Sequence, residues 1–328
     1  MRKVKAVRCL LCKKKCELVG GQRGDCRVRV NIGGQLTTLV YGKPCAVHVD
    51  PIEKKPLFHF LPASASFSIA TAGCNLHCKF CQNWQISQRE PEKTENVDMP
   101  PAQVVDAAVG GGCKTIAYTY AEPTVFYEYM LDACKIAHRF GVRNLWITAG
   151  FMEPQPLLEL CPQIDAANVD LKGFTEWYYK EICFAELGPV LETLKILRRE
   201  GVWLEITHLI VPTLNDKLED ISRMCDWLVA HLGYDVPLHF SRFWPMYQLK
   251  NLPPTPVEIL TEARQLAMSK GMHYVYVGNV PGHEGNHTYC ARCKKLVIER
   301  VGFEILQNNV GKDGRCTECG HKIPGVWV

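Results

Sequence analysis

The sequence lacks any apolar run long enough to cross a membrane, and no apolar segment separates its first basic residues from its first cysteines. We therefore expect neither a membrane span nor a signal peptide, and we predict a cytoplasmic location. Internal repeats and low-complexity linkers are also missing. With 47% apolar and 22% charged residues, the 328-residue chain has the composition of a globular protein, long enough for one large domain with small appendages.

Cysteine, in contrast, is abundant. In a chain with no export signal, seventeen cysteines are better explained by metal binding than by disulfides. Eleven of them form three groups. The other six lie mostly in helical patterns, where a cysteine is typically a small buried hydrophobe: Cys45, Cys113, Cys134, Cys161, Cys183 and Cys225.

The charge is distributed unevenly. Residues 1–30 hold ten Lys or Arg against two acids, a net charge of +8, so the remainder carries −4 of the total +4. This basic segment suits an RNA, an acidic protein or a phosphorylated substrate, although we favour an ordinary solvated surface slightly over these partners. A nucleic-acid partner is compatible with the charge, but no other feature supports one.

We divide the chain into a cysteine-rich module at 1–55, a central domain at 56–285 and a cysteine-paired module at 286–328. The central domain alternates short apolar strands with helices. Such strands are typical of a parallel sheet that is buried on both faces. The predicted strands are Ser66–Ala70, Thr115–Tyr120, Val142–Thr148, Ala167–Asp170, Trp203–Val211, Leu238–Phe243 and Tyr274–Gly278.

Proline and glycine mark the ends of the intervening helices. Pro101 and Pro123 open the first two, and Gly201, Gly233 and Gly271 follow three later ones. Six strand–helix units and a final strand predict an α/β fold of the β/α-barrel type, complete or partial. Functional residues of such a barrel should follow the carboxyl ends of its strands.

Cys74, Cys78 and Cys81 lie just after the first strand, with spacings of three and two residues. Three thiolates leave one iron of a four-iron cluster without a protein ligand, and an open metal position indicates chemistry rather than scaffolding. A structural zinc knuckle is the alternative. With the aromatic Phe80 before its last cysteine, the stretch resembles the radical SAM signature. The resemblance implies a partial (β/α)6 barrel and a [4Fe–4S] cluster whose open iron binds S-adenosylmethionine (SAM). The cluster would cleave SAM reductively to a 5′-deoxyadenosyl radical, with Cys74, Cys78 and Cys81 as the catalytic residues.

The same resemblance suggests which residues bind SAM, and all of them follow or lie on predicted strands. Tyr120 and Ala121 replace two glycines usual in the superfamily, ahead of Glu122. The Asp-Leu-Lys stretch matches that of pyruvate formate-lyase activating enzymes, and Lys172 would pair with the SAM carboxylate. For Asp170 and Lys172 the alternative is a solvated ion pair. For His208 it is a core histidine whose hydrogen bonds are made within the protein. The predicted SAM contacts are Phe80, Tyr120, Ala121, Glu122, Thr148, Gly150, Asp170, Lys172 and His208.

Two further cysteine sets have metal-binding spacings. Cys290, Cys293, Cys316 and Cys319 form two Cys-x2-Cys pairs, which indicate a zinc ribbon, with rubredoxin-like iron as the alternative. Cys9, Cys12, Cys16 and Cys26 are spaced less regularly. For this second set zinc is the first interpretation, an auxiliary iron–sulfur cluster the second and free thiols the third.

Several motifs together resemble the AmmeMemoRadiSam system radical SAM enzymes. They are the stretches at residues 50–57, 81–87, 168–172, 278–285 and 324–327. The resemblance implies an electron donor of the flavodoxin or ferredoxin type. It also suggests Memo-type and Ammecr-type proteins, or another macromolecule, as partners.

Three functions compete on this sequence. The first is a radical SAM enzyme with an unidentified substrate. The second is an activase that generates a glycyl radical in a partner enzyme, and the third is a non-enzymatic zinc-ribbon adaptor. We expect both flanking modules to enlarge the rim of the barrel, where a macromolecule could dock.

Overall fold

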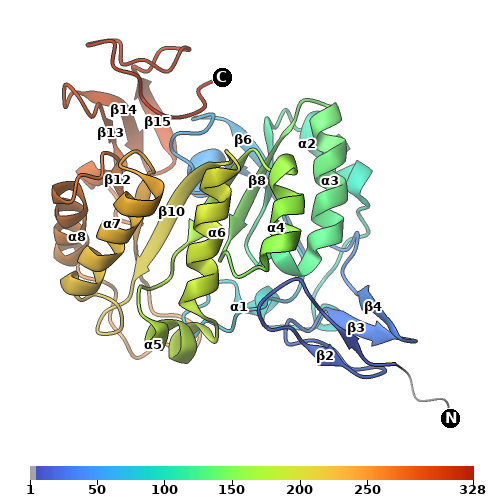
Figure 1. Ribbon diagram of the computed structural model, residues 1–328. Helices are drawn as coiled ribbons and strands as arrows, with labels where there is room; N and C mark the ends of the chain where they lie inside the picture. Colours follow the sequence, from blue (N-terminus) through green and yellow to red (C-terminus); the bar gives the residue numbers. More distant parts are fainter. Residues whose placement is uncertain (1–4) are drawn as a thin grey trace.

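A computed structural model describes residues 5–328 and is built around one eight-stranded sheet (Figure 1). Its strand order is β12-β11-β10-β9-β8-β7-β6-β5, so every strand pairs with its neighbours in sequence. The seven strands from β6 to β12 are parallel. These are β6 (Ala65–Ala70), β7 (Thr115–Tyr118), β8 (Arg143–Thr148), β9 (Ala166–Asp170), β10 (Trp203–Ile210), β11 (Leu238–Arg242) and β12 (Val275–Gly278).

One strand of the sheet was not predicted. β5 (Ala46–Pro51) pairs antiparallel with β6, placing Asp50 opposite Ser66. The sheet therefore begins before residue 55, where we placed the end of the first module. Since β5 and β12 stand at opposite ends of the strand order, the barrel is open. The predicted partial β/α barrel is confirmed.

Six helices cover the outer face of the curved sheet (Figure 1). Each buries one apolar stripe. In α7, for example, the buried residues Ile221, Met224, Cys225 and Leu228 recur at helical spacing. The helices are α2 (Pro101–Gly110), α3 (Tyr127–Arg139), α4 (Pro154–Leu160), α6 (Leu187–Arg199), α7 (Leu218–Leu232) and α8 (Val257–Ser269). Within residues 5–328, no helix is long and apolar enough to cross a membrane.

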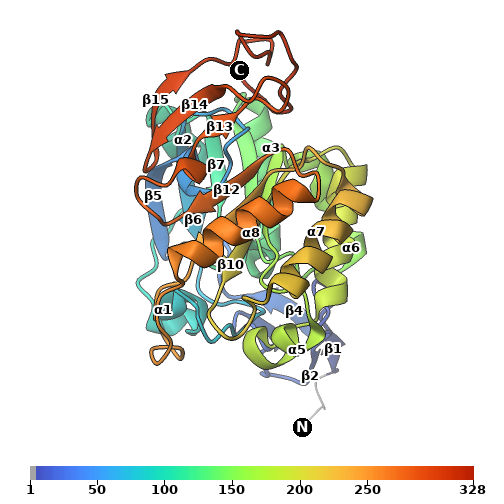
Figure 2. The same ribbon diagram turned by 90° about the vertical axis from the view of Figure 1, so that its left-hand side faces the viewer.

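The two small modules lie at opposite ends of the barrel (Figure 2). The amino-terminal module contains β1 (Val7–Arg8), β2 (Glu17–Leu18), β3 (Arg29–Ile32) and β4 (Gln35–Thr38). It sits at the carboxyl ends of the parallel strands, the end that also carries the short helices α1 (Trp84–Ser87) and α5 (Glu176–Tyr178). The carboxyl-terminal module contains β13 (Thr288–Tyr289), β14 (Leu296–Val301) and β15 (Glu304–Asn308). It covers the other end, so our expectation that both modules enlarge the same rim is wrong.

The segment between β5 and β6 closes the barrel at the end that the carboxyl-terminal module covers. Ile52, Leu57 and Phe60 of this segment pack inside the barrel against Ala117 and Leu145. Burying a polypeptide segment there requires partners for its polar backbone groups, because an unpaired buried N–H or C=O is costly.

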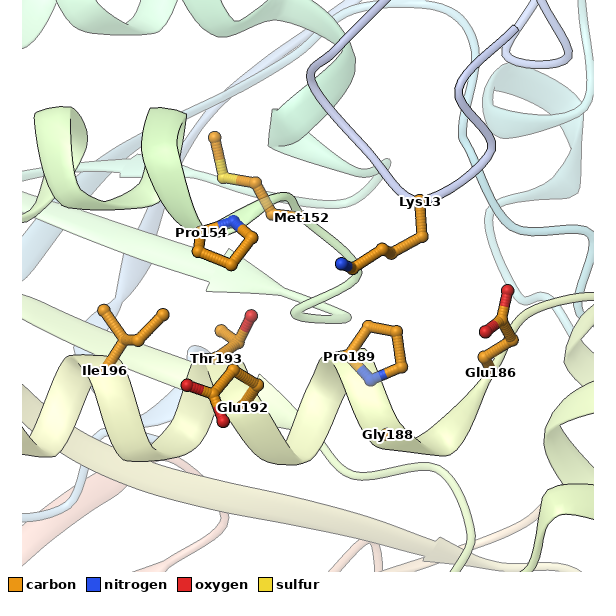
Figure 3. A pocket seen from close by; sticks show the side chains of 9 residues that line it. All are labelled: Lys13, Met152, Pro154, Glu186, Gly188, Pro189, Glu192, Thr193 and Ile196. Carbon is orange, nitrogen blue, oxygen red and sulfur yellow. The ribbon is translucent and has the colours of Figure 1, made fainter.

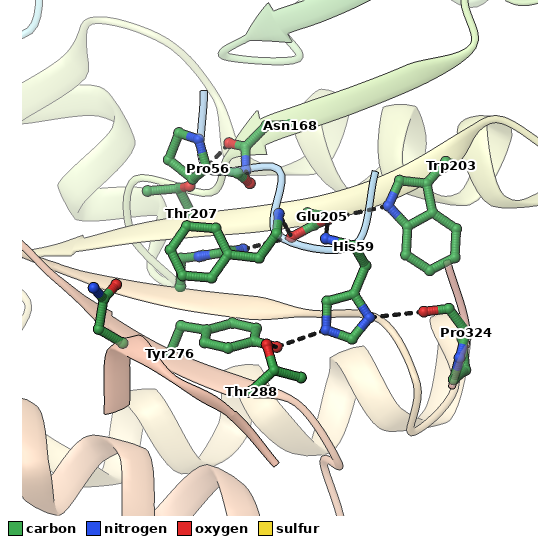
Figure 4. Close-up of polar contacts among 12 residues, drawn as sticks. Pro56, His59, Asn168, Trp203, Glu205, Thr207, Tyr276, Thr288 and Pro324 are labelled. Carbon is green, nitrogen blue, oxygen red and sulfur yellow. Dashed lines mark hydrogen bonds and ion pairs between the residues drawn. The ribbon is translucent and has the colours of Figure 1, made fainter. Parts of the chain in front are cut away.

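Glu205 on β10 supplies the central acceptor (Figure 4). Its carboxylate accepts hydrogen bonds from the backbone N–H groups of Phe58 (3.0 Å) and His59 (2.8 Å). It also accepts from the Trp203 indole (3.1 Å) and is bonded to Nε2 of His239 (2.7 Å). This carboxylate therefore joins the inserted segment to two barrel strands.

His59 links the same segment to the carboxyl-terminal module. One of its ring nitrogens lies 2.7 Å from the Pro324 carbonyl oxygen, and the other lies 2.6 Å from the Tyr276 hydroxyl. Arg300 of β14 donates to the Phe58 carbonyl at 3.0 Å. The carboxyl-terminal module is thus attached to the barrel through a buried polar network.

Replacing Glu205 by alanine should lower the free energy of unfolding by about 3–5 kcal/mol, because it leaves two backbone donors, an indole N–H and a buried histidine without their acceptor. Denaturant titration measures the change, with the exposed Glu304→Ala as control and an expected effect within about 0.5 kcal/mol. Burial alone would raise the pKa of Glu205, but the hydrogen-bonding partners of its carboxylate lower it. Its contribution should therefore be present above the ordinary glutamate pKa of about 4.3 and be lost as the pH falls below that value. Equal destabilisation by both variants would contradict this role.

Candidate active site

The loop after β6 places the three cysteines at the carboxyl edge of the sheet. Cys78 is buried, and Cys74 and Cys81 are half-buried. The backbone N–H of Leu76 donates to the Cys74 sulfur at 3.4 Å, and Sγ of Cys81 lies 3.1 Å from the Ser87 hydroxyl. These contacts fix the sulfurs in a loop that directly follows a barrel strand.

The spacing of these sulfurs does not suit a single tetrahedral ion. Four thiolates around one zinc lie about 2.3 Å from it, so the sulfurs are only about 3.8 Å apart. In the part of the chain that the structure describes, the sulfurs of Cys74, Cys78 and Cys81 do not gather within 4.8 Å of one another. Burial raises the pKa of Cys74, which couples thiol deprotonation to metal binding. A multi-iron cluster fits this donor set.

Lys172 lies between the cysteine loop and the end of β9. Its ammonium group is 2.9 Å from the Asp170 carboxylate and 5.8 Å from the centre of the Phe80 ring. Burial opposes the shift, yet the charges of Asp170 and Cys78 raise the pKa of Lys172 well above its usual value. The structure therefore brings Phe80, Asp170 and Lys172 together beside Cys78, with a permanent positive charge among them.

Glu122 is fully engaged in joining two strand ends. Its carboxylate accepts from the Thr148 hydroxyl and the Ala149 N–H, both at 2.7 Å, and from the hydroxyl and N–H of Thr124 at 2.7 and 3.1 Å. Burial raises the pKa of Glu122, and these donors oppose the shift. The Thr148 hydroxyl in turn accepts from the Gly150 N–H at 2.9 Å. Glu122, Thr148 and Gly150 thus form one rigid unit at the ends of β7 and β8.

Tyr120 has a left-handed backbone with φ of 60°. Its carbonyl accepts from the Asn83 side chain at 2.8 Å, which ties the turn of Tyr120 and Ala121 to the cysteine loop. Its hydroxyl donates to Asp50, which also pairs with buried Lys55 at 2.6 Å. Burial lowers the pKa of Lys55 to about 8. The aromatic side chain thus turns away from the loop toward this ion pair.

His208 is buried and leaves one ring nitrogen without a protein partner. Its Nδ1 lies 2.7 Å from the Leu171 carbonyl oxygen and must donate to it, which leaves Nε2 as an acceptor. That atom is buried and has no hydrogen-bond partner in the protein. Burial lowers the pKa of His208 to about 4, so the ring is neutral at pH 7. The ring lies beside Phe174, Asn215 and Ile221 of α7, so the structure does not bring His208 together with the cysteine loop as we predicted.

Cys183, which we interpreted as a small buried hydrophobe, lies next to the cysteine loop. It ends a π-helical turn at Tyr179–Cys183, whose carbonyls accept from the N–H groups of His77 and Lys79 at 3.0 Å. A hydrogen bond with the Cys183 thiol, together with burial, raises the pKa of Cys78 well above the ordinary range. Only the tertiary structure brings this turn to the cysteine loop, so no local pattern could have revealed it.

The carboxyl-terminal cysteines form a compact four-sulfur site. Sγ of Cys290 lies 3.6 Å from that of Cys319, Sγ of Cys293 lies 3.9 Å from that of Cys316, and all four lie within 4.8 Å of one another. Each pair has the same knuckle, closed by a backbone hydrogen bond of 2.9 Å from Lys294 to Cys290 and from Gly320 to Cys316. Four sulfurs at these distances suit a single tetrahedral ion, zinc or iron.

The amino-terminal cysteines are arranged differently. Cys9, Cys12, Cys16 and Cys26 lie in neighbouring loops of one small module, but no three of their sulfurs come within 4.8 Å of one another. This geometry does not match that of the carboxyl-terminal set.

A pocket of about 260 Å³ lies between the amino-terminal module and the helices α4 and α6 (Figure 3). Lys13 of the amino-terminal module reaches over it, and Pro154, Pro189 and Thr193 of α4 and α6 line it. None of the predicted SAM contacts lines this pocket. We therefore locate the candidate active site by its side chains rather than by this cavity.

We expect the full chain to bind one metal ion per molecule at the carboxyl-terminal cysteines, with zinc as our prediction. Cys293→Ser should remove it and lower the thermal midpoint, since structural metal binding contributes to folding free energy. Elemental analysis and thermal unfolding of the purified chain measure both effects, with Cys113→Ser as control. Unchanged metal content in Cys293→Ser would exclude this site.

Known proteins that are similar to this chain include members of the radical SAM superfamily. The family model "Radical SAM superfamily" matches residues 68–228. An uncharacterized protein of Methanocaldococcus jannaschii is 47% identical over 318 residues, covering 97% of this chain and 95% of that protein. The pyruvate formate-lyase-activating enzyme of Clostridium pasteurianum is 25% identical over 159 residues, which cover 47% of this chain and 65% of the enzyme.

Solved structures share the fold. A radical SAM methyltransferase from Sphaerobacter thermophilus has a TM-score of 0.53 at 16% identity, covering 72% of this chain and 71% of that one. Streptococcus suis SuiB bound to S-adenosylmethionine has a TM-score of 0.52 at 11% identity, covering 70% and 53%. The chain carries a radical SAM superfamily domain and belongs to the same family as the uncharacterized Methanocaldococcus jannaschii protein.

Proposed function

We propose that this protein is a radical SAM enzyme that cleaves SAM reductively at a [4Fe–4S] cluster and acts on a substrate not yet identified. The observation that carries the proposal is the three-cysteine loop at the carboxyl ends of the parallel strands, with the Lys172 ammonium beside Cys78. Membership of the radical SAM superfamily supports the same chemistry.

The proposed division of labour follows from the chain's own residues. Cys74, Cys78 and Cys81 would hold the cluster, which supplies the electron that breaks a carbon–sulfur bond of bound SAM. Lys172 offers a positive charge to the SAM carboxylate. Burial around these groups excludes water, which strengthens each contact.

The cysteine loop is tested by SAM cleavage. Anaerobically reconstituted protein with dithionite should form 5′-deoxyadenosine, and replacing Cys74, Cys78 and Cys81 together by alanine should abolish it. Chromatography of the nucleoside product measures the yield. Cys113→Ala, which changes a buried cysteine of the α2–β7 connection, should retain activity. Product formation by the triple variant at the wild-type level would exclude the proposal.

Lys172→Ala should weaken SAM binding roughly ten- to a hundred-fold, because a charge-assisted contact contributes about 1.5–3 kcal/mol. Equilibrium dialysis on reconstituted protein of equal iron content gives the affinity. Lys195→Ala removes an exposed lysine of α6 that lies 3.9 Å from Glu192 and should leave binding unchanged. Equal affinities for wild type and Lys172→Ala would remove Lys172 from the SAM site.

A second candidate function is the activation of a glycyl radical enzyme, supported by the similarity to pyruvate formate-lyase-activating enzymes. In the first proposal the chain is an AmmeMemoRadiSam system enzyme, with Memo-type or Ammecr-type partners, a cytoplasmic location and a flavodoxin or ferredoxin as electron donor. Incubation with SAM, reductant and candidate partners, followed by mass analysis and EPR, separates the two. A stable glycyl radical in a partner supports activation, whereas a modified product without one supports the first proposal.

A further inference from the structure

The amino-terminal cysteine set is held in a small, tightly turned module. The N–H of Cys9 donates to the carbonyl of Cys16 at 3.0 Å, and the N–H of Gly24 donates to the carbonyl of Arg29 at 2.8 Å. Lys15 and Arg27 adopt left-handed backbones with φ of 45° and 71°, which close the turns after Cys12 and Cys26. Both non-glycine residues tolerate this conformation at some cost, so the turns are firmly held.

The four sulfurs are largely withdrawn from solvent. Cys9 and Cys12 are buried, and Cys16 and Cys26 are half-buried. The N–H of Asp25 lies 3.5 Å from Sγ of Cys16, and a donor directed at sulfur stabilises the thiolate, the form that binds metal.

A buried cation faces the same sulfurs. Arg29 is only 3% exposed, and its charge acts on both Cys9 and Cys26. Its terminal nitrogens pair with Glu128, one of them at 2.8 Å, but its Nε–H is buried without a partner. A buried donor with no acceptor is costly. An anionic group held by the neighbouring cysteines would supply the missing negative charge.

The spacing of the sulfurs separates the two kinds of metal centre. The carboxyl-terminal four lie within 4.8 Å of one another, as one tetrahedral ion requires, whereas no three of the amino-terminal four do. The amino-terminal set thus resembles Cys74, Cys78 and Cys81 rather than the carboxyl-terminal site. Four cysteine ligands spread over several metal atoms are typical of iron–sulfur clusters.

This module packs directly on the cysteine loop of the barrel. At Gly73 an added Cβ would lie 2.5 Å from the carbonyl oxygen of Cys26, so the two backbones touch where only glycine fits. Asp25 lies 2.9 Å from His77, between the first two loop cysteines. The two cysteine loops therefore form one packed unit.

Three lysines of the amino-terminal module also bond to residues of the barrel. Lys14 donates to the Phe184 carbonyl at 2.7 Å, and Lys13 and Lys15 reach Glu153 at 3.3 and 3.4 Å. Part of the basic charge of the first thirty residues thus attaches the module to the barrel, so these lysines do not form an unoccupied surface patch.

We propose that Cys9, Cys12, Cys16 and Cys26 bind a second iron–sulfur cluster, next to the loop of Cys74, Cys78 and Cys81. This cluster takes one electron from an external donor protein, which is oxidised by one electron, and carries it toward the barrel. The carrier role rests on the proposed function, whereas the existence of the cluster does not.

The decisive protein is the full chain with Cys74, Cys78 and Cys81 replaced by alanine, since iron found in it cannot come from the barrel loop. After anaerobic reconstitution with iron and sulfide, we expect two or four iron atoms per chain with equal sulfide, a Mössbauer spectrum of a cluster, and a single zinc. Adding Cys12→Ala should remove the iron, whereas adding Cys45→Ala should not. A triple variant without iron, or with a second zinc, would overturn the site.

Two further readouts leave the four amino-terminal cysteines in place while their cluster is observed. Arg29→Gln should shift the reduction potential of this cluster to a more negative value in the triple variant, because the lost positive charge no longer favours the reduced form. In reduced wild-type protein, the EPR signals of the two clusters should broaden each other, and each signal should sharpen when the other set of cysteines is replaced. An unchanged potential would remove Arg29 from the site, and unbroadened signals would overturn the carrier role.

Because the triple variant lacks the barrel cysteines, its iron content is independent of SAM cleavage. Failure of wild-type protein to form 5′-deoxyadenosine with this iron present would count against the proposed function alone. Loss of this iron with SAM cleavage by wild type intact would count against the second cluster alone.

Discussion

Parallel strand direction is the constraint on which the rest of this structure depends. Because β6 to β12 all run the same way, the residues that follow them meet at one edge of the sheet. The cysteine loop follows β6, Glu122 follows β7, Thr148 ends β8, and Lys172 follows β9. Residues almost a hundred positions apart thus come together because the ends of the strands position them. The sheet is a rigid scaffold that holds each of them in place.

The opposite edge carries no such chemistry and is closed instead. There the segment between β5 and β6 fills the barrel, the Glu205 carboxylate satisfies its backbone donors, and the four-cysteine module packs over it. A compact metal site at that end reinforces a small module that has little apolar core of its own. The position of the carboxyl-terminal cysteines, far from the barrel loop, agrees with a structural rather than a chemical role.

Sequence patterns predicted what depends on local order and missed what depends on tertiary contact. All seven parallel strands were located to within two residues at each end, because their apolar character and flanking turns are local signals. We did not predict β5, because His48 and Asp50 interrupt its apolar pattern. It is the edge strand of the sheet and pairs with β6 alone. The π-helical turn that brings Cys183 to Cys78 and the free Nε2 of His208 are consequences of packing, which no spacing encodes.

The distribution of buried charge distinguishes the cysteine sets more sharply than their spacing in sequence does. Lys172 lies beside Cys78, and Arg29 lies beside Cys9 and Cys26, each a cation withdrawn from water. Burying a cation is costly unless an anion compensates it. Asp170 and Glu128 supply part of that compensation. Anionic metal centres on the neighbouring sulfurs would supply the remainder. Beside neutral thiols the buried cations lack part of their compensating negative charge. Beside an occupied metal site they would gain it, so the same cations would stabilise the bound centre.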